Sequence, residues 1–365
     1  MTAVLHVISG LATGGAETTL VQLAGALQAR GMPQHVISVG NRGAYADELE
    51  RHGVTVSTLG IGSLYGGPIG LLRLIRLMHQ LQPRLVQGWM YHGNIMAALG
   101  LRFTPGRAGR RLMWNLRASN MDAERYGWLI RLCAMTSTWP DVVIANSQAG
   151  VDFHLGRGFR PRHIELISNG IDTEKFKPDP VARSAVRAEL RISPDAVLVI
   201  HVARVDPMKD HDAFLTVMEG LPNVYGIMVG AGTPNLRPLP NVRALGLRHD
   251  IECLYAAADI VVSTSAFGEG FSNAIAEGMS AELVPVATDV GDALLIIGEA
   301  GRIVARRDLA ALTAAIAAEA AAAPAERKSR GAKARERILS HFSLTQAVDA
   351  YERLYLSLEN NAEDR

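Results

Sequence analysis

The chain has 365 residues with 37 Lys and Arg against 36 Asp and Glu, so its formal net charge is +1. This balance disfavours a dedicated nucleic-acid-binding protein, and a hydrophobic content of 48% disfavours a disordered chain. The length predicts two domains of ordinary size. The two cysteines, Cys133 and Cys253, lie far apart and outside any Cys/His cluster. They therefore favour neither a disulfide framework nor a structural zinc site, and they fit a reducing cytosol.

The amino-terminal segment does not read as a signal peptide, because Ala3–Ser9 is short and no basic segment precedes it. The longest uncharged runs, 54–72 and 85–101, are interrupted by glycines and polar residues, which disfavours a transmembrane helix. We therefore expect a cytoplasmic protein that is soluble or attached to the inner face of the cytoplasmic membrane.

Apolar runs of strand length alternate with helix-length segments through the first half of the chain. This rhythm predicts a mostly parallel sheet that is covered by helices on both faces. The expected strands are 3–9, 34–39, 54–59, 85–87, 111–115, 142–146 and 164–167, and the expected helices are 16–30 and 71–80.

The same rhythm restarts after a linker candidate at Glu174–Pro180. We expect an amino-terminal domain over 1–168, a second over 169–342, and a terminal helix at 343–360 that packs back on the first domain. The second set has expected strands at 197–202, 225–229, 242–245, 260–263 and 285–288, and expected helices at 212–219, 251–257, 273–279, 309–340 and 344–358.

Ligands of open α/β sheets bind beyond the carboxyl ends of the strands, so residues just after strands are the first candidates for a site. The loop Gly10–Glu17 follows the first strand and contains Gly14 and Gly15. Its backbone amides and the following helix start suit an anion. It is neither a dinucleotide fingerprint nor a Walker A loop, and glycines at this place are also often structural.

Two cations follow the first strand of the second half, within a segment that we name the cation loop, Ala203–Asp210. Arg204 and Lys209 stand five residues apart there and could hold a diphosphate from one side. The alternative interpretation is solvated surface charge.

The most informative segment is Phe267–Gly278, named here the glutamate loop, which follows the expected strand at 260–263. Gly268 and Gly270 allow a tight turn, and Ser272 or Asn273 is a natural helix N-cap. Carboxylates are good acceptors for sugar hydroxyls, and the helix start suits a phosphate. The glutamates, Glu269 and Glu277, could point into one cleft.

Together these features resemble the retaining glycosyltransferases of family 4, whose GT-B fold has two Rossmann-like domains that face an interdomain cleft. The resemblance covers nearly the whole chain and depends on motifs in the expected order. These are the opening segment 4–17, the junction 168–172, the Arg-x4-Lys of the cation loop, the segment 245–250 and the Glu-x7-Glu of the glutamate loop.

The resemblance implies roles for individual residues. Arg204 and Lys209 would hold the donor diphosphate and stabilise the leaving group. Glu277 would accept hydrogen bonds from the ribose, and Glu269 from hydroxyls of the donor sugar. His92 stands where the family often has a cleft histidine near the reacting sugar, although a lone histidine also fits a polar loop.

The remaining implied contacts are with the donor. The backbone of Gly270, Phe271 and Ser272, together with Asn273, would line the sugar and phosphate site. Arg248 would pack against the nucleobase. From the first domain, the two glycines of the opening loop, Gly14 and Gly15, would approach the phosphate.

The resemblance also implies that no metal or other cofactor is needed and that the anomeric configuration is retained. No Asp-x-Asp motif directly follows an expected strand. The sequence Glu269–Asn273 resembles users of UDP-sugars more than users of GDP-mannose. The expected donor is therefore a nucleotide-diphosphate sugar, with UDP preferred.

Four departures from the family pattern affect the local turn geometry. Glu282 replaces a usual glycine, and the following proline comes one place later, at Pro285. In the cation loop, Ala203 and Asp210 also stand where the family usually has glycine.

The net charge conceals an asymmetry between the two halves. Residues 1–165 have 16 Arg, no Lys and 9 acidic residues, which gives +7, whereas residues 166–365 carry −6. If the terminal segment 341–365, at −3, packs on the first domain, its excess falls to +4. Basic residues interleaved with Trp, Phe and Leu suit an anionic bilayer, although an ordinary arginine-rich surface fits as well. The residues concerned are Arg102, Arg107, Arg110, Arg111, Arg125 and Arg131.

We therefore expect a transferase that moves a sugar to a saccharide or lipid-linked acceptor, in the synthesis of cell-surface polysaccharide or glycolipid. Two alternatives share the fold: a non-hydrolysing nucleotide-sugar epimerase, and a non-catalytic subunit that only binds nucleotide. Incubation of the donor alone would reveal an epimerase.

Overall fold

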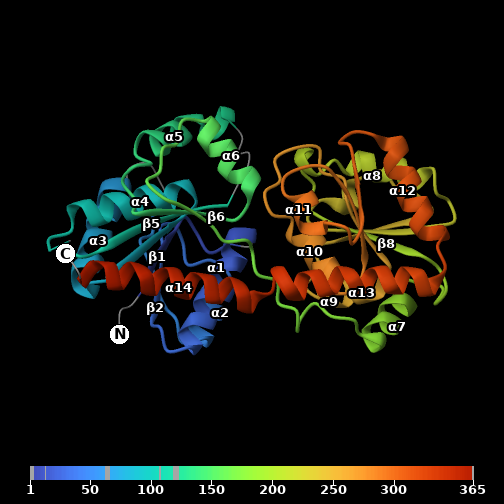
Figure 1. Cartoon of the computed structure of the whole chain (residues 1–365), viewed down its shortest axis with the longest axis horizontal. Coiled ribbons are helices and arrows are strands. Elements are labelled where there is room, and N and C mark those ends of the chain that lie inside the picture. Colours follow the sequence, from blue (N-terminus) through green and yellow to red (C-terminus); the bar gives the residue numbers. More distant parts are fainter. Residues whose placement is uncertain (1–3, 13, 62–65, 107, 118–122, 364–365) are drawn as a thin grey trace. The chain divides into compact units, whose positions relative to one another are not determined.

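The computed structural model describes residues 4–12, 14–61, 66–106, 108–117 and 123–363. The chain forms two compact units (Figure 1): Met1–Gly170 together with Leu344–Arg365, and Ile171–Ser343. The expected boundaries were 1–168 and 169–342, so Asn169 and Gly170 fall in the first unit.

The first unit contains a seven-stranded parallel sheet in the order β3-β2-β1-β4-β5-β6-β7. The order reverses between β1 and β4, and such a switch point is where ligands of open α/β sheets bind. The strands are β1 (Val4–Ile8), β2 (Gln34–Ser38), β3 (Thr55–Thr58), β4 (Leu85–Trp89), β5 (Arg111–Leu116), β6 (Val142–Ala145) and β7 (Ile164–Leu166).

Helices cover both faces of this sheet, and successive β1 side chains enter different cores. Val4 and Ile8 belong to one buried cluster, whereas Leu5 and Val7 belong to the other. This alternation explains why the strand is apolar throughout. The helices are α1 (Gly15–Ala29), α2 (Ala46–Arg51), α3 (Gly66–Leu81), α4 (Met90–Phe103), α5 (Ala123–Met135), α6 (Gln148–Gly156) and α14 (Leu344–Glu363).

The terminal helix α14 belongs to the first unit and lies beside α1 (Figure 1). Tyr351 and Tyr355 are buried, and the Tyr351 hydroxyl accepts a hydrogen bond from Asn115 Nδ2 at 2.8 Å. Arg30, the C-cap of α1, forms ion pairs with Asp349 and Glu352, both at 2.6 Å. The first unit therefore has 18 basic and 14 acidic residues, a charge of +4.

The second unit contains a six-stranded parallel sheet in the order β10-β9-β8-β11-β12-β13, which reverses between β8 and β11. Its strands are β8 (Leu198–Val202), β9 (Tyr225–Val229), β10 (Val242–Gly246), β11 (Ile260–Ser263), β12 (Val284–Thr288) and β13 (Arg302–Val304). Its helices are α7 (Pro180–Glu189), η1 (Pro207–Lys209), α8 (His211–Glu219), η2 (Thr233–Asn235), α9 (Ile251–Ala257), α10 (Asn273–Ser280), α11 (Ala293–Ile297), α12 (Leu309–Ala321) and α13 (Pro324–His341).

The expected single helix over 309–340 is wrong. It is two helices, α12 and α13, that meet at 114°. Pro324 occupies the first turn of α13, and it keeps the preceding Ala323 out of the helical region, at φ −58° and ψ 143°. Among the described residues, no single helix is long and apolar enough to cross a membrane, and this bent pair passes that test by length and composition only.

Glu282 occupies a position that glycine would normally fill. It follows α10 with a φ of 65°, and the Leu283 amide donates to Gly278 O at 3.0 Å while the Glu282 amide donates to Met279 O at 3.1 Å. This is a Schellman motif, in which the left-handed residue is usually glycine. The unusual glutamate therefore strains the turn but does not abolish it.

We expect Glu282→Gly to raise the free energy of unfolding by about 1 kcal/mol, because glycine removes the cost of a side chain in left-handed backbone. Urea unfolding measures this change. Glu326→Gly, within the first turn of α13, is the matched control and should lower stability by a similar amount. A loss of stability in Glu282→Gly would contradict the turn assignment.

Candidate active site

The cation loop and the glutamate loop meet at the switch point of the second sheet. The first follows β8 and the second follows β11, and these two strands are neighbours. Residues about 60 positions apart in sequence are therefore brought together at the carboxyl ends of adjacent strands.

The centre of this arrangement is an ion pair between Lys209 Nζ and Glu269 Oε1. Ser265 Oγ donates to the same carboxylate oxygen at 2.6 Å. The Lys209 side chain is 23% exposed and that of Glu269 is 9% exposed. A partly buried ammonium is thus held at the strand ends while it keeps access to solvent.

Arg204, the other cation of the loop, is held more loosely. Its side chain is 70% exposed and contacts Asp206 at 3.1 Å. Asp206 also accepts a hydrogen bond from the Met208 amide at 3.0 Å, and this bond caps the start of η1. Exposed ion pairs contribute little to stability, so Arg204 can exchange this contact for a bound anion.

Residues that the sequence patterns did not single out hold the cation loop in place. The Thr264 hydroxyl lies 2.8 Å from Lys209 O and 3.0 Å from Asp210 O, so it donates to one of them and accepts from His201 Nε2 at 3.1 Å. His211 Nε2 donates to Ala203 O at 3.2 Å. Burial lowers the pKa of both histidines, which keeps them neutral. The sequence feature that could have indicated this role is a histidine within the otherwise apolar run Leu198–Val202.

The departure at Asp210 has a local explanation. Its φ is 47°, which favours glycine, but its side chain caps α8 by accepting from the Ala213 amide at 3.2 Å. Aspartate tolerates left-handed backbone better than most residues. The loop geometry is therefore kept without glycine.

Glu277 lies on α10, and burial raises the pKa of its carboxyl group to about 7. The hydroxyl of the buried Tyr255 lies 3.3 Å from Glu277 Oε2 and opposes this shift as a hydrogen-bond donor. The same hydroxyl lies 3.0 Å from Ala274 O. Tyr255 was not expected from the sequence. It positions a carboxyl group whose charge changes near neutral pH.

The start of α10 presents backbone groups. Ser272 is its N-cap, but its side chain makes no capping hydrogen bond, whereas the sequence suggested Ser272 or Asn273 as a cap. Phe271 is 6% exposed and packs on Phe342, so only its backbone can line a site. Gly270 O accepts from the Asp292 amide at 3.1 Å, which holds the loop against 291–292.

Arg248 is bound by two carboxylates. Its guanidinium contacts Asp250 at 2.7 Å and Glu189 at 2.8 Å. These hydrogen bonds, that from Asp250 first, raise the pKa of Arg248. The arginine therefore ties β10 to α7 and α9, and its contact with a nucleobase stays a prediction.

In the first unit, Gly14 and Gly15 follow β1 at the switch point between β1 and β4. Gly14 is the extended N-cap of α1, and a Cβ there would lie 2.4 Å from Glu17 Oε2. The Glu17 side chain therefore folds over the helix start, as expected for a helix-start charge, and its burial raises the pKa of that carboxyl group. A phosphate at this helix start would have to displace it.

His92 lies in the first turn of α4, directly after β4. Met90, which precedes it, has a φ of +60°, and strained backbone of this kind is common at functional sites. Gly93 allows the helix to approach β1, because a Cβ there would lie 2.3 Å from Val7 O. The His92 side chain reaches solvent, and the burial of the rest of its surface lowers its pKa.

The sequence patterns also missed Arg117, which follows β5 at the same edge of this sheet. Its guanidinium donates to Asn115 Oδ1 and to the Tyr351 hydroxyl, both at 2.9 Å, and lies 4.8 Å from the centre of the Trp89 ring. The sequence feature that could have indicated Arg117 is a charged residue directly after a buried strand.

No group of three or more His, Cys, Asp or Glu residues could hold a metal ion within the part of the chain that the structure describes. Metal independence stays a prediction.

Two family models match the chain in order. Residues 13–175 match Glycosyltransferase Family 4, and residues 196–320 match Glycosyl transferases group 1. Among solved structures, Anabaena HepE in complex with UDP-glucose has a TM-score of 0.84 and 22% identity, over 97% of this chain and 100% of that chain. Sucrose-phosphate synthase from Thermosynechococcus elongatus has a TM-score of 0.81 and 18% identity, over 98% of this chain and 99% of that chain. These likenesses show the GT-B fold.

The curated relatives match a shorter stretch. D-inositol 3-phosphate glycosyltransferase of Mycobacterium sp. (strain KMS) is 30% identical over 149 residues, which cover 36% of this chain and 33% of the relative. That of Segniliparus rotundus is 28% identical over 172 residues, 41% and 37% of the two chains. The matched stretch thus spans about a third of the length of these relatives. With both family models matched in order on a GT-B fold, the chain belongs to the family 4, group 1 glycosyltransferases.

Proposed function

We propose that this protein is a retaining glycosyltransferase that moves a sugar from a nucleotide-diphosphate sugar to a saccharide or lipid-linked acceptor. The observation that carries the proposal is the ion pair of Lys209 and Glu269 beside Arg204 at the β8/β11 switch point. Family membership supports the reaction class.

In the proposed reaction, the bond between the anomeric carbon and the phosphate oxygen breaks as the bond to the acceptor oxygen forms on the same face. Arg204 and Lys209 neutralise the departing diphosphate, which receives the proton of the acceptor hydroxyl. Fixed positive groups at the leaving oxygen stabilise such a transition state. Glu269 orients Lys209 through their ion pair and accepts hydrogen bonds from the sugar hydroxyls.

The other proposed contacts hold the donor. The Glu277 carboxylate accepts the ribose hydroxyls, and the backbone at 270–272 with Asn273 lines the sugar and phosphates. His92 is proposed to act near the reacting sugar. UDP is the preferred nucleotide. This preference is supported by the sequence Glu269–Asn273 and by the similarity to HepE, whose structures contain UDP-glucose or UDP.

A transfer assay tests the proposal. The protein is incubated with a radiolabelled UDP-sugar and a bacterial lipid and polysaccharide extract, and label in the acceptor fraction is measured. Transfer that Arg204→Ala abolishes supports the proposal. An epimer formed from the donor alone would instead identify an epimerase, and nucleotide binding without either product would identify a non-catalytic subunit.

The acceptor is proposed to lie at an anionic membrane, at the inner face of the cytoplasmic membrane. The first unit carries +4 rather than +7 once α14 is included. On α5, Trp128 is 65% exposed and Met135 is 80% exposed, with the exposed Arg131 between them. Apolar and basic side chains on one helix suit a bilayer surface. Arg107 and the side chain of Arg125 lie outside the described residues.

We expect the wild-type protein to float with anionic vesicles and Trp128→Ser/Met135→Ser to show about tenfold less recovery, because bilayer contact would bury these apolar side chains. Val181→Ser/Leu339→Ser changes exposed apolar residues of the second unit and should float like the wild type. Equal recovery of the wild type with neutral and anionic vesicles would refute membrane attachment.

A further inference from the structure

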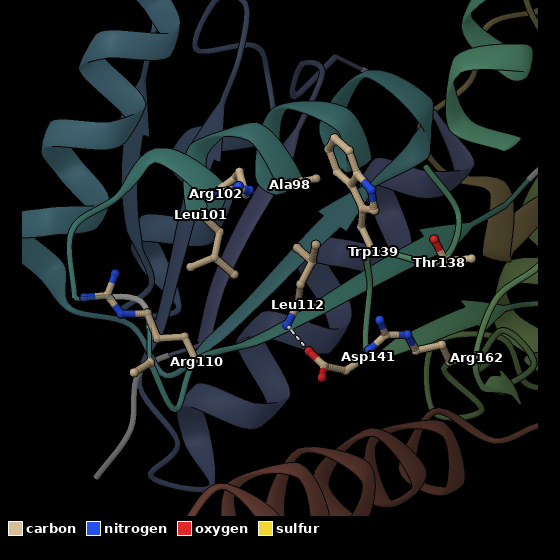
Figure 2. Close-up of a pocket in the computed structure, with 10 residues that line it drawn as sticks. Ala98, Leu101, Arg102, Arg110, Leu112, Thr138, Trp139, Asp141 and Arg162 are labelled. Atoms are coloured by element: carbon tan, nitrogen blue, oxygen red, sulfur yellow. Dashed lines mark hydrogen bonds between the residues drawn. The ribbon is translucent and has the colours of Figure 1, made fainter. Parts of the chain in front are cut away.

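A cavity of about 410 Å³ opens at the amino-terminal edge of the first sheet (Figure 2). Its lining residues come from the carboxyl-terminal half of α4, from the start of β5 and the segment before it, and from the segments just before β6 and β7. The predicted active-site residues of this unit, Gly14, Gly15 and His92, follow β1 and β4 at the opposite edge. The cavity is therefore separate from them, and the proposed transfer reaction does not use it.

The cavity carries more positive than negative charge, with three arginines against one aspartate. Arg102 and Arg162 are exposed, and neither makes an ion pair within the described ranges of the chain. Arg110 donates from Nη2 to Gln82, but its buried Nη1 has no hydrogen-bond partner among the described residues. Burial lowers the pKa of Arg110, and a bound anion would offset that cost.

The one carboxylate is already committed to the protein. Asp141 accepts from the Leu112 amide at 2.8 Å, the bond drawn in Figure 2, and lies 3.5 Å from Arg111. The ends of α4 and α5 also place partial negative charge nearby, about half a charge each. The negative charge of Asp141 and the two helix ends is together smaller than the positive charge of the three arginines, so the cavity still favours an anion.

The rest of the lining favours an anion that carries an organic group. Leu101 and Leu112 are 8% and 6% exposed and lie at the centre of the view in Figure 2. Trp139, which is 47% exposed, forms part of the wall. The volume suits a small molecule rather than an inorganic ion. Arginine binds phosphate through paired hydrogen bonds, and an indole face suits a polyol or sugar.

We infer that this cavity binds the phosphate ester of a small polyol, either as a soluble sugar phosphate or as the head group of a phospholipid. Arg102 and Arg162 contact the phosphate, and Trp139 covers the polyol, while Arg110 adds positive charge at the far side of the cavity. Binding at this site is independent of the nucleotide-sugar site in the second unit.

The test compares Arg102→Gln/Arg162→Gln with a control, Arg51→Gln/Arg76→Gln, which removes two exposed arginines of the same unit outside the cavity. One arm titrates sn-glycerol 3-phosphate and glucose 6-phosphate by calorimetry. The other measures binding to phosphatidylcholine vesicles with and without phosphatidylglycerol. Thermal unfolding and UDP affinity show that both variants are folded.

Binding of a soluble phosphate ester that falls at least about tenfold in the cavity variant alone supports the site with a soluble ligand. Binding only to phosphatidylglycerol vesicles, with the same selective loss, supports a lipid head group. Failure of the wild type to bind either probe, or equal losses in both variants, would overturn the inference. None of these outcomes depends on sugar transfer.

Discussion

Replacing Lys209 with alanine is expected to lower turnover by about 10²–10³-fold, the usual effect of removing one group that stabilises developing negative charge. The substitution also leaves Glu269 without its cation. Because this carboxylate is 9% exposed, its lost partner should reduce stability too. Steady-state rates with a UDP-sugar and urea unfolding measure the two effects.

A second variant separates catalysis from folding. Lys209→Ala/Glu269→Ala removes both charges, so we expect stability to recover while turnover stays low. Lys328→Ala, which removes an exposed lysine of the same unit, should change neither. If the double variant regained turnover, the loss in the single variant would reflect the removal of the lysine from the Glu269 carboxylate and not the loss of a charge at the leaving group.

Replacing Glu277 with glutamine is expected to remove a pH dependence of donor binding. The Glu277 pKa is raised to about 7, and its carboxylate is the form that accepts two ribose hydroxyls. Affinity for UDP-glucose should therefore rise about tenfold between about pH 6 and pH 8 in the wild type. In Glu277→Gln, affinity should stay low throughout, about tenfold or more below the wild type at pH 8.

The same pKa has a consequence for stability with the opposite sign. A carboxyl group with a raised pKa binds its proton more tightly in the folded state. The contribution of the Glu277 carboxyl group to the free energy of unfolding is therefore fully present below its unfolded pKa of 4.5. It is lost as the pH rises through about 7. Near pH 8 the free energy of unfolding of Glu277→Gln should therefore exceed that of the wild type by about 3 kcal/mol.

Glu219→Gln is the control for both measurements, because Glu219 is exposed and pairs with Arg237. It should follow the wild type in affinity and in stability. Donor affinity in Glu277→Gln that still rises with pH would assign the titration to another group.

Most of the fold could be predicted from local patterns. Strands such as β1, β8 and β11 are buried on both faces, so they are apolar throughout and easily recognised. Helices that were missed, such as α6 and α7, are short and lie beside turn-rich segments. The break at Pro324 was missed because the alanine-rich and charged segments on either side have similar helix propensities.

The candidate site was predictable only in part. Glycines and charged residues after strands marked both loops, because strand ends are where an α/β sheet binds ligands. The ion pair of Lys209 with Glu269, and the hydrogen bond from Tyr255 to Glu277, depend on strand order and helix packing. No local sequence pattern specifies those contacts. The geometry of Glu282 likewise follows from its place after α10.

The most direct test of the central claim is a thermal-shift panel of nucleotide sugars. A selective donor at about 100 times its dissociation constant should stabilise the wild type by about 2.7 kcal/mol. We expect UDP-sugars to raise the melting temperature more than GDP-sugars, and we expect the shift to vanish in Arg204→Ala/Lys209→Ala. A panel in which no nucleotide sugar stabilises the wild type, or in which this variant responds equally, would contradict the account.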